Sequence, residues 1–331
     1  MNILRESDAS LDPLHGKTVA VLGYGNQGRA QALNLRDSGI DVVIGNREDE
    51  YGEQAVEEGW EPLPIIAAAA AGDIVLVLTT DESQPLIWEE QILPGIQPGN
   101  TLCWGSGYNV GYEVLKPPQT ANVIMIAPIM PGNVVRRRYE AGSGVIGQFA
   151  IHHDSSGEGR DITLALCHGM GLTRAGIYET SMLGEAHLNL FTEQVVWAGL
   201  NAWITLCYET AVAAGHDPEE VIMVLYASTE NAEIFRLCAE YGFFKQATYH
   251  STTSQYGSLT RSATIFNDEV RAQAHHNLVH DIMGGAFVKE WTHGHAEATE
   301  RLEALRREAL EHPMSKNEDR VIAMLGQSHE Q

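Results

Sequence analysis

Three glycines in a six-residue segment have the spacing that dinucleotide-binding turns require. The segment reads Gly23, Tyr24, Gly25, Asn26, Gln27 and Gly28, and it follows the apolar run Thr18–Leu22 directly. In such a setting the first glycine permits a tight turn, the second lets the backbone approach a pyrophosphate, and the third allows close helix–strand packing. The helix N-terminus then supplies N–H donors to the phosphates. Residues 23–28 are therefore predicted to bind NAD(P)H; the alternative is a glycine-rich turn without a ligand.

The turn after the next apolar run is expected to select between the two nicotinamide cofactors. It reads Gly45, Asn46, Arg47, Glu48, Asp49 and Glu50. A carboxylate at this place can accept both ribose hydroxyls of NADH and repel a 2′-phosphate, whereas an arginine favours NADPH. Because three acids outweigh one arginine, we predict NADH, with NADPH as the alternative, and Arg47 can instead stack on the adenine. The remaining alternative is a solvated acidic turn that does not discriminate between NADH and NADPH.

The elements that position these turns alternate in type through the first half of the chain. Apolar runs that read as buried strands are Thr18–Leu22, Val42–Ile44, Ile74–Leu78, Thr101–Cys103 and Val123–Ile126, with a further extended segment at Gly144–His152. Helix-like segments such as Ala30–Asp37 and Gly52–Glu58 separate them, and another follows at Asp161–Gly169. This alternation predicts a doubly wound parallel sheet, a Rossmann domain, over residues 1–181.

The pattern changes after about Ser181, where strand-like runs disappear. Long helical patterns follow at Leu183–Ala213, Pro218–Glu240, Asn267–Met283 and Ala296–Leu310. The second of these has Asp217 as its predicted cap and Pro218 in its first turn. Residues 182–331 are therefore predicted to form an all-helical domain, so the fold class is α/β followed by all-α.

Charge and composition exclude several classes of partner. The net charge of −23 opposes binding to nucleic acid and to anionic membranes, and it weakly favours a cationic small-molecule substrate. No apolar run reaches membrane-spanning length, and the charged N-terminus lacks the apolar core of a signal peptide. The four cysteines are widely scattered and lack metal-ligand spacing. A cytoplasmic location is the expectation.

Ordered segments along nearly the whole chain also carry a family resemblance. They include GYGNQGRAQALNLRDSGIDVVIG at residues 23–45, Asp81-Glu82 with Gln84-Pro85, Ala127–Gly132, Val134–Val145, Phe191–Gln194, Lys289–Trp291 and Glu303–Pro313. On these segments the chain resembles the short class of ketol-acid reductoisomerases, also called acetohydroxy acid isomeroreductases. The resemblance implies a Rossmann domain and a helical domain that intertwines with a second subunit. It thus implies a homodimer whose active sites are each built from both subunits.

The resemblance further implies a two-step reaction that depends on metal ions. Enzymes of this family move an alkyl group within an acetohydroxy acid and then reduce the resulting 2-keto acid with NADPH, while two Mg²⁺ ions polarise the oxygens. The ions are held by an Asp and a Glu four residues apart on one helix and by two Glu four residues apart on another. This spacing places both members of each pair on one helix face.

At these four positions the chain departs from the family. The first pair corresponds to Asn189 and Glu193, and the second to Tyr226 and Glu230. Because two carboxylates cannot balance two dications, we predict that the dinuclear magnesium site is lost. A single metal at Glu193 and Glu230 is the alternative.

Further positions follow from the same resemblance. Ile129 stands where the family has a lysine, and Ser106 stands where it has a histidine, whereas Ser251 corresponds to its substrate-contacting serine. The predicted cofactor site consists of residues 23–28, Arg47, Glu48, Asp49, Asp81, Gln84, Ser106 and Gly132.

These departures predict a reductase that no longer isomerises its substrate. Hydride transfer needs a nicotinamide held close to an electron-poor carbon, and a protonated imine offers such a carbon without a Lewis acid. We therefore expect reduction of a C=N bond, as in a cationic imine, or of a C=O bond. The residues predicted to line the pocket are Asn189, Glu193, Tyr226, Glu230 and Ser251. The alternatives are a true ketol-acid reductoisomerase converting 2-acetolactate-type substrates to 2,3-dihydroxy acids, and a non-catalytic nucleotide-binding protein.

For each of these pocket residues a purely structural role is the alternative. Glu193 and Glu230 can be solvated helix residues. Tyr226 can be ordinary core with its hydroxyl satisfied. Asn189 can hydrogen-bond only its neighbours, and Ser251 can be a turn residue.

Overall fold

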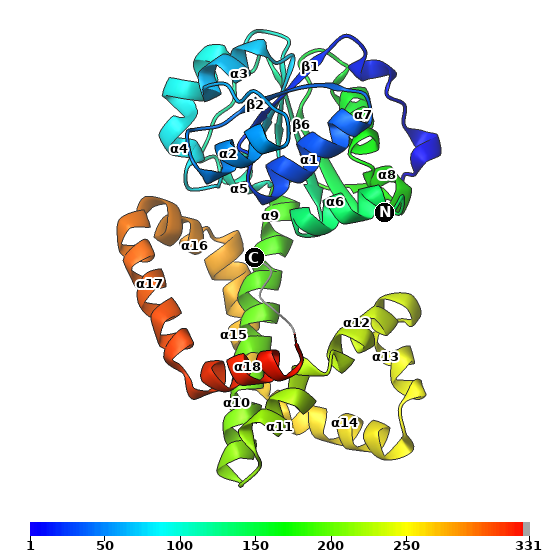
Figure 1. The fold of residues 1–331 in the computed structure, drawn as a ribbon, viewed down its shortest axis with the longest axis vertical. Helices are drawn as coiled ribbons and strands as arrows, with labels where there is room; N and C mark the ends of the chain where they lie inside the picture. The colour runs from blue at the N-terminus through cyan, green and yellow to red at the C-terminus, as the bar shows by residue number, and fades with distance from the viewer. Residues whose placement is uncertain (327–331) are drawn as a thin grey trace. The chain divides into compact units, whose positions relative to one another are not determined.

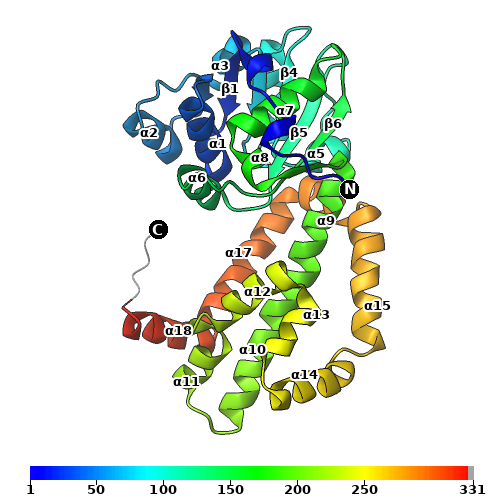
Figure 2. The same cartoon turned by 90° about the vertical axis from the view of Figure 1, so that its right-hand side faces the viewer.

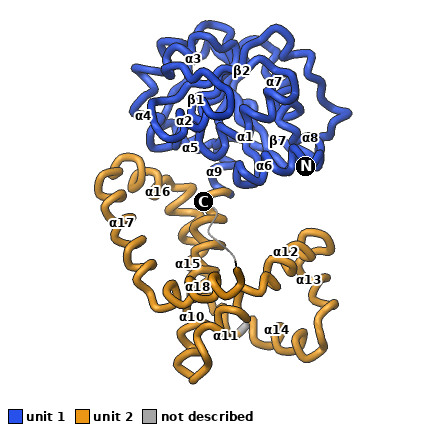
Figure 3. Tube along the Cα trace, in the orientation of Figure 1, with its two compact units in different colours: residues 1–188 blue, residues 189–331 orange. Residues whose placement is uncertain are grey.

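The computed structural model describes residues 1–326 (Figure 1). The chain divides into two compact units, Met1–Leu188 and Asn189–Gln331, which Figure 3 shows in different colours. The division falls inside helix α9 (Met182–Phe191). The boundary predicted from the sequence, between residues 181 and 182, lies at the start of this helix.

The first unit contains a seven-stranded sheet with the order β2-β1-β3-β4-β5-β6-β7. The strands are β1 (Thr18–Leu22), β2 (Asp41–Gly45), β3 (Ile74–Val77), β4 (Thr101–Trp104), β5 (Asn122–Pro128), β6 (Gly147–His153) and β7 (Ile177–Glu179). Because β2 and β3 flank β1 on opposite sides, the strand order reverses beside β1. Ligands of doubly wound sheets bind at the carboxyl ends of the strands at such a reversal. The predicted Rossmann fold is therefore confirmed.

One strand departs from the predicted parallel arrangement. β6 pairs antiparallel with β5, whereas the other neighbouring strands pair in parallel. It begins beside the end of β5, with Gly147 opposite Pro128. The connection at residues 129–146 therefore turns back at one edge of the sheet, and α6 lies within this connection.

Helices cover both faces of the sheet, as Figure 1 shows. Along β1, Val19 and Val21 join one buried cluster with residues of α1, α6 and α7. Ala20 and Leu22 join a second cluster with residues of α3. A strand that is buried on both faces explains the continuous apolar run TVAVL. The helices of this unit are α1 (Asn26–Asp37), α2 (Glu50–Glu57), α3 (Ile65–Ala71), α4 (Gln84–Ile87), α5 (Tyr108–Gly111), α6 (Gly132–Glu140), α7 (Gly159–Gly169), α8 (Leu172–Ala175) and the start of α9.

The second unit is helical throughout its described residues (Figure 2), as predicted. Its α-helices after α9 are α10 (Ala198–Ala213), α11 (Pro218–Ile222), α12 (Glu230–Tyr241), α13 (Phe243–Gln246), α14 (Thr252–Ile265), α15 (Asp268–His276), α16 (Ala286–Val288), α17 (His295–Glu311) and α18 (Pro313–Met324). Wider π-helical turns join several of them, at Thr192–Trp197, Met223–Ala227, Asn277–Met283 and Lys289–His293.

The helix predicted over Pro218–Glu240 is interrupted. Asp217 caps its start as expected, because its side chain accepts from the N–H groups of Glu219 and Glu220. After the π-helical turn, however, Thr229 adopts φ +63°, in the left-handed region, and α12 begins at the next residue. A β-branched residue rarely takes this conformation, so neither residue type nor periodicity indicates the break.

The second unit has a small buried core for its length. Four apolar residues are fully buried in one cluster: Tyr208, Val221, Ile222 and Val321. Many large apolar side chains elsewhere in this unit are instead exposed, among them Trp197, Val224, Phe235, Phe244 and Leu259. No helix within residues 1–326 is both long and apolar enough to span a bilayer.

Candidate active site

The turn between β1 and α1 excludes side chains at two of its three glycines. Gly23 adopts φ +96°, and a Cβ there would lie 2.9 Å from the backbone nitrogen of Thr79. A Cβ on Gly28 would lie 1.9 Å from the carbonyl oxygen of Gly23. Nothing lies within 4 Å of a Cβ placed on Gly25. The space beside Gly25 is therefore open at the place where a pyrophosphate would approach the backbone.

Tyr24 of this turn points into the protein. Its side chain is fully buried, and its hydroxyl donates to Glu58 Oε2 (2.6 Å) and accepts from Trp60 Nε1 (2.7 Å). Burial and the Glu58 carboxylate raise the pKa of Tyr24, so the hydroxyl stays protonated. Glu58 is also paired with Arg29 of α1. The side chain of Tyr24 is thus engaged within the protein and is not left to face a ligand.

Asn26 and Gln27 use their side chains to hold the segment after β5. Asn26 Oδ1 accepts from the Asn133 N–H (3.1 Å), and Gln27 Nε2 donates to the Met130 carbonyl (2.8 Å). A Cβ on Gly132 would lie 1.8 Å from the Asn26 carbonyl oxygen. Gly132, predicted as a cofactor residue, therefore permits close contact between α6 and the glycine turn.

The turn after β2 is organised by Asp49. Its carboxylate accepts from the N–H groups of Tyr51 and Gly52, which caps α2, and it pairs with Arg47 Nε at 2.5 Å. Burial alone would raise the pKa of Asp49, but hydrogen bonds from Arg47, Gly52 and Asn46 hold it below its ordinary value. Asp49 is therefore ionised and engaged within the turn.

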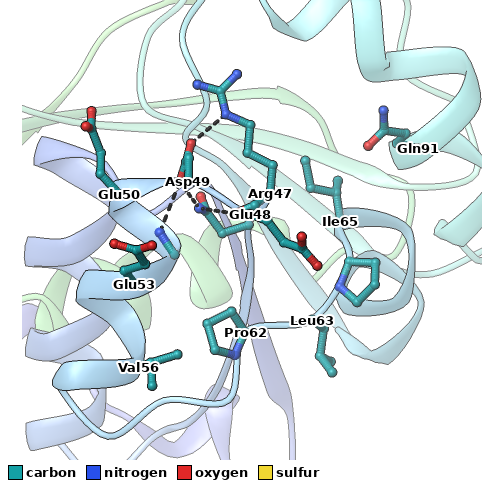
Figure 4. Close-up of a pocket in the computed structure, with 13 residues that line it drawn as sticks. Arg47, Glu48, Asp49, Glu50, Glu53, Val56, Pro62, Leu63, Ile65 and Gln91 are labelled. Carbon is teal, nitrogen blue, oxygen red and sulfur yellow. Dashed lines mark hydrogen bonds and ion pairs between the residues drawn. The ribbon is translucent and has the colours of Figure 1, made fainter.

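A cavity of about 680 Å³ opens beside this turn. Figure 4 shows Glu48, Glu50 and Glu53 around it, while the Arg47 guanidinium is bonded to Asp49. Pro62, Leu63 and Ile65 form an apolar side of the same cavity. The cavity lies at the end of β2, where the adenosine of a dinucleotide binds in Rossmann domains.

Gln84 is used inside the protein at the ends of β3 and β4. It is 2% exposed; its Nε2 donates to the Thr79 carbonyl (2.9 Å), and its Oε1 accepts from Trp104 Nε1 (3.1 Å) and Asn109 Nδ2 (2.9 Å). Asn109 Nδ2 also donates to the carbonyl of Asp81 (2.9 Å). Gln84 and Asn109 thus fix the two loops that carry Asp81 and Ser106.

Ser106 lies in a loop that is seated on α9. Its Oγ accepts from the Tyr108 N–H (3.1 Å). The neighbouring Gly107 N–H donates to Glu185 Oε2 (2.6 Å), and a Cβ on Gly107 would lie 2.0 Å from the Met182 carbonyl oxygen. Asn109 and Glu185 were not predicted from the sequence. For Glu185 the available signal was its position, an acid four residues before Asn189.

The first pair of predicted catalytic residues is in contact. Asn189 of α9 donates from Nδ2 to Glu193 Oε1 at 3.3 Å. Both side chains are exposed. Because Nδ2 is used in this hydrogen bond, Asn189 Oδ1 and the remaining carboxylate lone pairs are the oxygen donors that the pair offers.

The second pair does not share one continuous helix. Tyr226 lies in the π-helical turn Met223–Ala227, and Glu230 begins α12 beyond the left-handed Thr229. Tyr226 packs against the small core of the helical unit, and its hydroxyl donates to Glu318 Oε1. Burial and Glu318 raise the pKa of Tyr226. The expectation that the two side chains lie on one helix face is therefore wrong here, because the helix breaks between them.

Ser251 acts as a helix cap. It precedes α14, and its Oγ accepts from the Ser254 N–H at 3.2 Å. The side chain is exposed. The structure thus gives Ser251 a local role and does not bring it to the other predicted pocket residues by any hydrogen bond that it makes within residues 1–326.

Asn189 and Glu193 can form part of a site for a hard cation. Within residues 1–326 no three His, Cys, Asp or Glu side chains of one chain come together as a metal site. Asn189 and Glu193 offer an amide oxygen and a carboxylate side by side. Mg²⁺ commonly binds through one or two carboxylates and keeps several waters. The pair therefore fits one Mg²⁺ ion completed by water or a further carboxylate.

Comparisons with known proteins cover both units. Residues 13–176 match the family model described as "Acetohydroxy acid isomeroreductase, NADPH-binding domain". Residues 183–327 match "Ketol-acid reductoisomerase, C-terminal domain". The ketol-acid reductoisomerase (NADP(+)) of Methanopyrus kandleri is 41% identical over 98% of each chain, and that of Pyrobaculum arsenaticum is 39% identical over 95% of each chain. The solved structure of an NADH-preferring ketol-acid reductoisomerase from an uncultured archean has 36% identity and a TM-score of 0.92, and the match covers 97% of this chain and 98% of that one.

These matches contradict the prediction of a C=N or C=O reductase that does not isomerise, and the cationic imine was part of that prediction. They favour its alternative, because both halves of the chain match one family over nearly their full length. The prediction was wrong because it treated the replacements at Asn189 and Tyr226 as enough to abolish the isomerisation. An amide oxygen still ligates a hard cation, and Glu193 and Glu230 are retained. The predictions of the family and of an enzyme with an NAD(P)H-binding domain are confirmed: the chain belongs to the ketol-acid reductoisomerase family.

Proposed function

We propose that this chain is a ketol-acid reductoisomerase, which converts 2-acetolactate-type substrates to 2,3-dihydroxy acids with a nicotinamide cofactor and a divalent metal. The observation that carries the proposal is the match of the helical half. Many oxidoreductases share a Rossmann domain, so that domain alone does not indicate a reaction. Here the C-terminal family model covers residues 183–327 as well.

The reaction places definite demands on the residues. The alkyl group moves from C2 to C3 while the C2 hydroxyl loses its proton, which makes C2 a ketone and C3 an alcohol. Hydride from the nicotinamide then adds to C2, and a proton adds to its oxygen. The proton transfers require a positioned base. The exposed carboxylate of Glu230 is the base that the family positions of this chain offer, since Glu193 is assigned to the metal.

The metal complement is proposed to be one Mg²⁺ per active site, in place of two. The ion would supply Lewis-acid polarisation of the substrate oxygens. Asn189 and Glu193 would hold it, with water completing its coordination. Tyr226 adds no ligand to this set, because its hydroxyl is engaged by Glu318. A direct measure is the stoichiometry of Mg²⁺ binding, for which we expect one ion per chain, whereas two tightly bound ions would contradict the proposal.

NADH is proposed as the preferred cofactor. Arg47 is paired with Asp49, and Glu48 and Glu50 line the adjoining cavity, so a 2′-phosphate would meet net negative charge. The similar ketol-acid reductoisomerase of known structure, from an uncultured archean, is NADH-preferring, which agrees with this proposal. Replacing both acids, Glu48→Gln with Glu50→Gln, should lower the KM for NADPH by about three- to tenfold, because each removed charge relieves weak solvent-screened repulsion. Glu57→Gln, at the opposite end of α2 from Glu50, is the matched control.

A homodimer through the helical unit is proposed as the assembly. The support is the small core of that unit beside its many exposed apolar side chains, a pattern typical of surfaces that pack against another chain. In the family each active site takes residues from both subunits. Analytical ultracentrifugation should find a dimer at micromolar concentration; a stable monomer would contradict the proposal.

The function itself is tested by incubating the purified protein with 2-acetolactate, NADH and Mg²⁺. We expect NADH oxidation that stops when the metal is chelated, and a 2,3-dihydroxy acid as the product. NADH oxidation that persists in the presence of a chelator, or no oxidation with either NADH or NADPH, would refute the proposal.

A further inference from the structure

We propose that Asn46 is a positioning residue that joins the cofactor-selecting turn (residues 46–50) to the glycine turn (residues 23–28), so that adenosine ribose and pyrophosphate are recognised together. The inference rests on the proposed function only in taking these two turns as the NAD(P)H site. It assigns a role to a side chain that sits between them.

Asn46 uses both ends of its carboxamide. Its Oδ1 accepts from the backbone N–H of Tyr24 at 3.1 Å, and its Nδ2 donates to Asp49 Oδ1 at 2.8 Å and to the Arg47 carbonyl at 2.9 Å. Its own backbone N–H donates to the Leu63 carbonyl at 3.1 Å. The Asn46 side chain thus forms a direct hydrogen-bonded link between the two turns.

The link is reinforced from the other end of α2. Tyr24, whose N–H is held by Asn46, has its hydroxyl bonded to Glu58 and Trp60. Residues 46 and 58–60 lie on either side of α2 in the chain. Tyr24 is therefore held at its backbone by the start of this segment and at its side chain by the end. Displacing the selecting turn would displace the glycine turn as well.

Two consequences for the cofactor follow. The Tyr24 N–H is already occupied, so the first N–H groups of α1 are the donors left for phosphate. Asp49 in turn receives hydrogen bonds from Asn46, from Arg47 and from the Gly52 N–H in the first turn of α2. Asn46 therefore helps to keep Arg47 paired and unavailable to a 2′-phosphate. Its loss should weaken binding of NADH and should also reduce the discrimination against NADPH.

The test is Asn46→Ala in the full-length protein, with dissociation constants for NADH and NADPH measured by fluorescence titration without substrate. We expect NADH binding about tenfold weaker, because the two turns lose the three hydrogen bonds of the Asn46 side chain, and we expect the ratio of the NADPH to the NADH dissociation constant to fall severalfold.

Asn100→Ala is the matched control. Asn100 also bridges two turns, because its Oδ1 accepts from the Gln97 N–H and its Nδ2 donates to the carbonyls of Gly72 and Asp73. It precedes β4 and so lies at the amino edge of the sheet, opposite the cofactor edge. We expect both variants to lower the melting temperature but only Asn46→Ala to change the two dissociation constants and their ratio.

The outcomes separate this inference from the proposed function. If Asn46→Ala lowers stability as Asn100→Ala does and leaves both dissociation constants unchanged, Asn46 is merely structural and the inference is overturned. If the unaltered protein binds NADH but does not convert 2-acetolactate, the proposed function fails while the role of Asn46 is still measured. If it binds neither cofactor, both fail.

Discussion

The cofactor turns and the proposed catalytic positions are held in opposite ways. Around the cofactor turns, Tyr24, Gln84, Asn109 and Glu185 are each less than 5% exposed and hydrogen-bonded within the chain. In the helical unit, Asn189, Glu193 and Glu230 are exposed. A site whose supporting residues are fixed by the same chain is formed in advance of binding. Under the proposed function, one chain would complete its cofactor site but would leave its catalytic site to be completed by metal, substrate and a second chain.

Removing one catalytic carboxylate is expected to have the largest effect. Glu193→Gln should lower kcat with 2-acetolactate by about 100-fold or more, because an ionic metal ligand becomes neutral. The dissociation constant for NADH should not change, since the cofactor turns keep their own contacts. Steady-state kinetics and fluorescence titration measure the two quantities. Glu233→Gln, which alters an exposed acid of α12, is the control. A large loss of NADH binding in Glu193→Gln would contradict the view that the cofactor site is held independently of the catalytic positions.

Mixing two inactive variants tests whether the catalytic site is shared between chains. Glu193→Gln and Glu230→Gln should each be nearly inactive alone. If Glu193 and Glu230 of one site come from different subunits, half of the sites in a mixed dimer are intact, so mixed dimers isolated through both tags should recover about half of full activity. The measurement is specific activity of the co-purified, differently tagged chains. No recovery in verified mixed dimers would place both carboxylates in one chain's site.

Restoring a carboxylate at residue 189 should sharpen the metal requirement. Asn189→Asp adds a charged oxygen ligand beside Glu193, and affinity for hard cations rises with ligand charge. We expect the Mg²⁺ concentration for half-maximal activity to fall about tenfold. The quantity is read from activity against free Mg²⁺, with calorimetry as a second readout. Unchanged dependence on Mg²⁺ would show that residue 189 is not a ligand.

The smallest expected effect concerns the break before α12. Thr229 holds a left-handed conformation that costs a β-branched residue about 1 kcal/mol or more. Thr229→Gly should therefore stabilise the protein by about 0.5–1 kcal/mol in urea unfolding, without changing NADH affinity. A loss of stability of similar size would instead be the result expected for glycine inside a continuous helix.

The cofactor turns and the catalytic positions differ in how much of their structure could be predicted from the sequence. The glycine turn was predictable because its constraints are local: Gly23 and Gly28 lie where a Cβ would meet backbone atoms. The buried strands were likewise predictable, because their own composition is apolar. The antiparallel β6 was not predictable, because strand direction depends on how residues 129–146 return and not on residue type.

The catalytic positions were predictable as positions but not in their surroundings. The family resemblance placed Tyr226 and Glu230 four residues apart, but the left-handed Thr229 between them gives no signal in the sequence. The partner of Tyr226, Glu318, is 92 residues away in the chain, and no local pattern links the two. Gln84 was predicted as a cofactor contact, and only the three-dimensional structure shows its amide engaged by Thr79, Trp104 and Asn109.

The most direct test of the account follows the hydride into the product. The protein is incubated with 2-acetolactate, Mg²⁺ and NADH deuterated at the transferred position of C4, and the products are analysed by mass spectrometry and NMR. A ketol-acid reductoisomerase must place deuterium on C2 of a 2,3-dihydroxy acid whose alkyl group has moved to C3, with one product formed for each NADH oxidised. Deuterium at C3 of an unrearranged 2,3-dihydroxy acid would reveal simple ketone reduction and contradict the account.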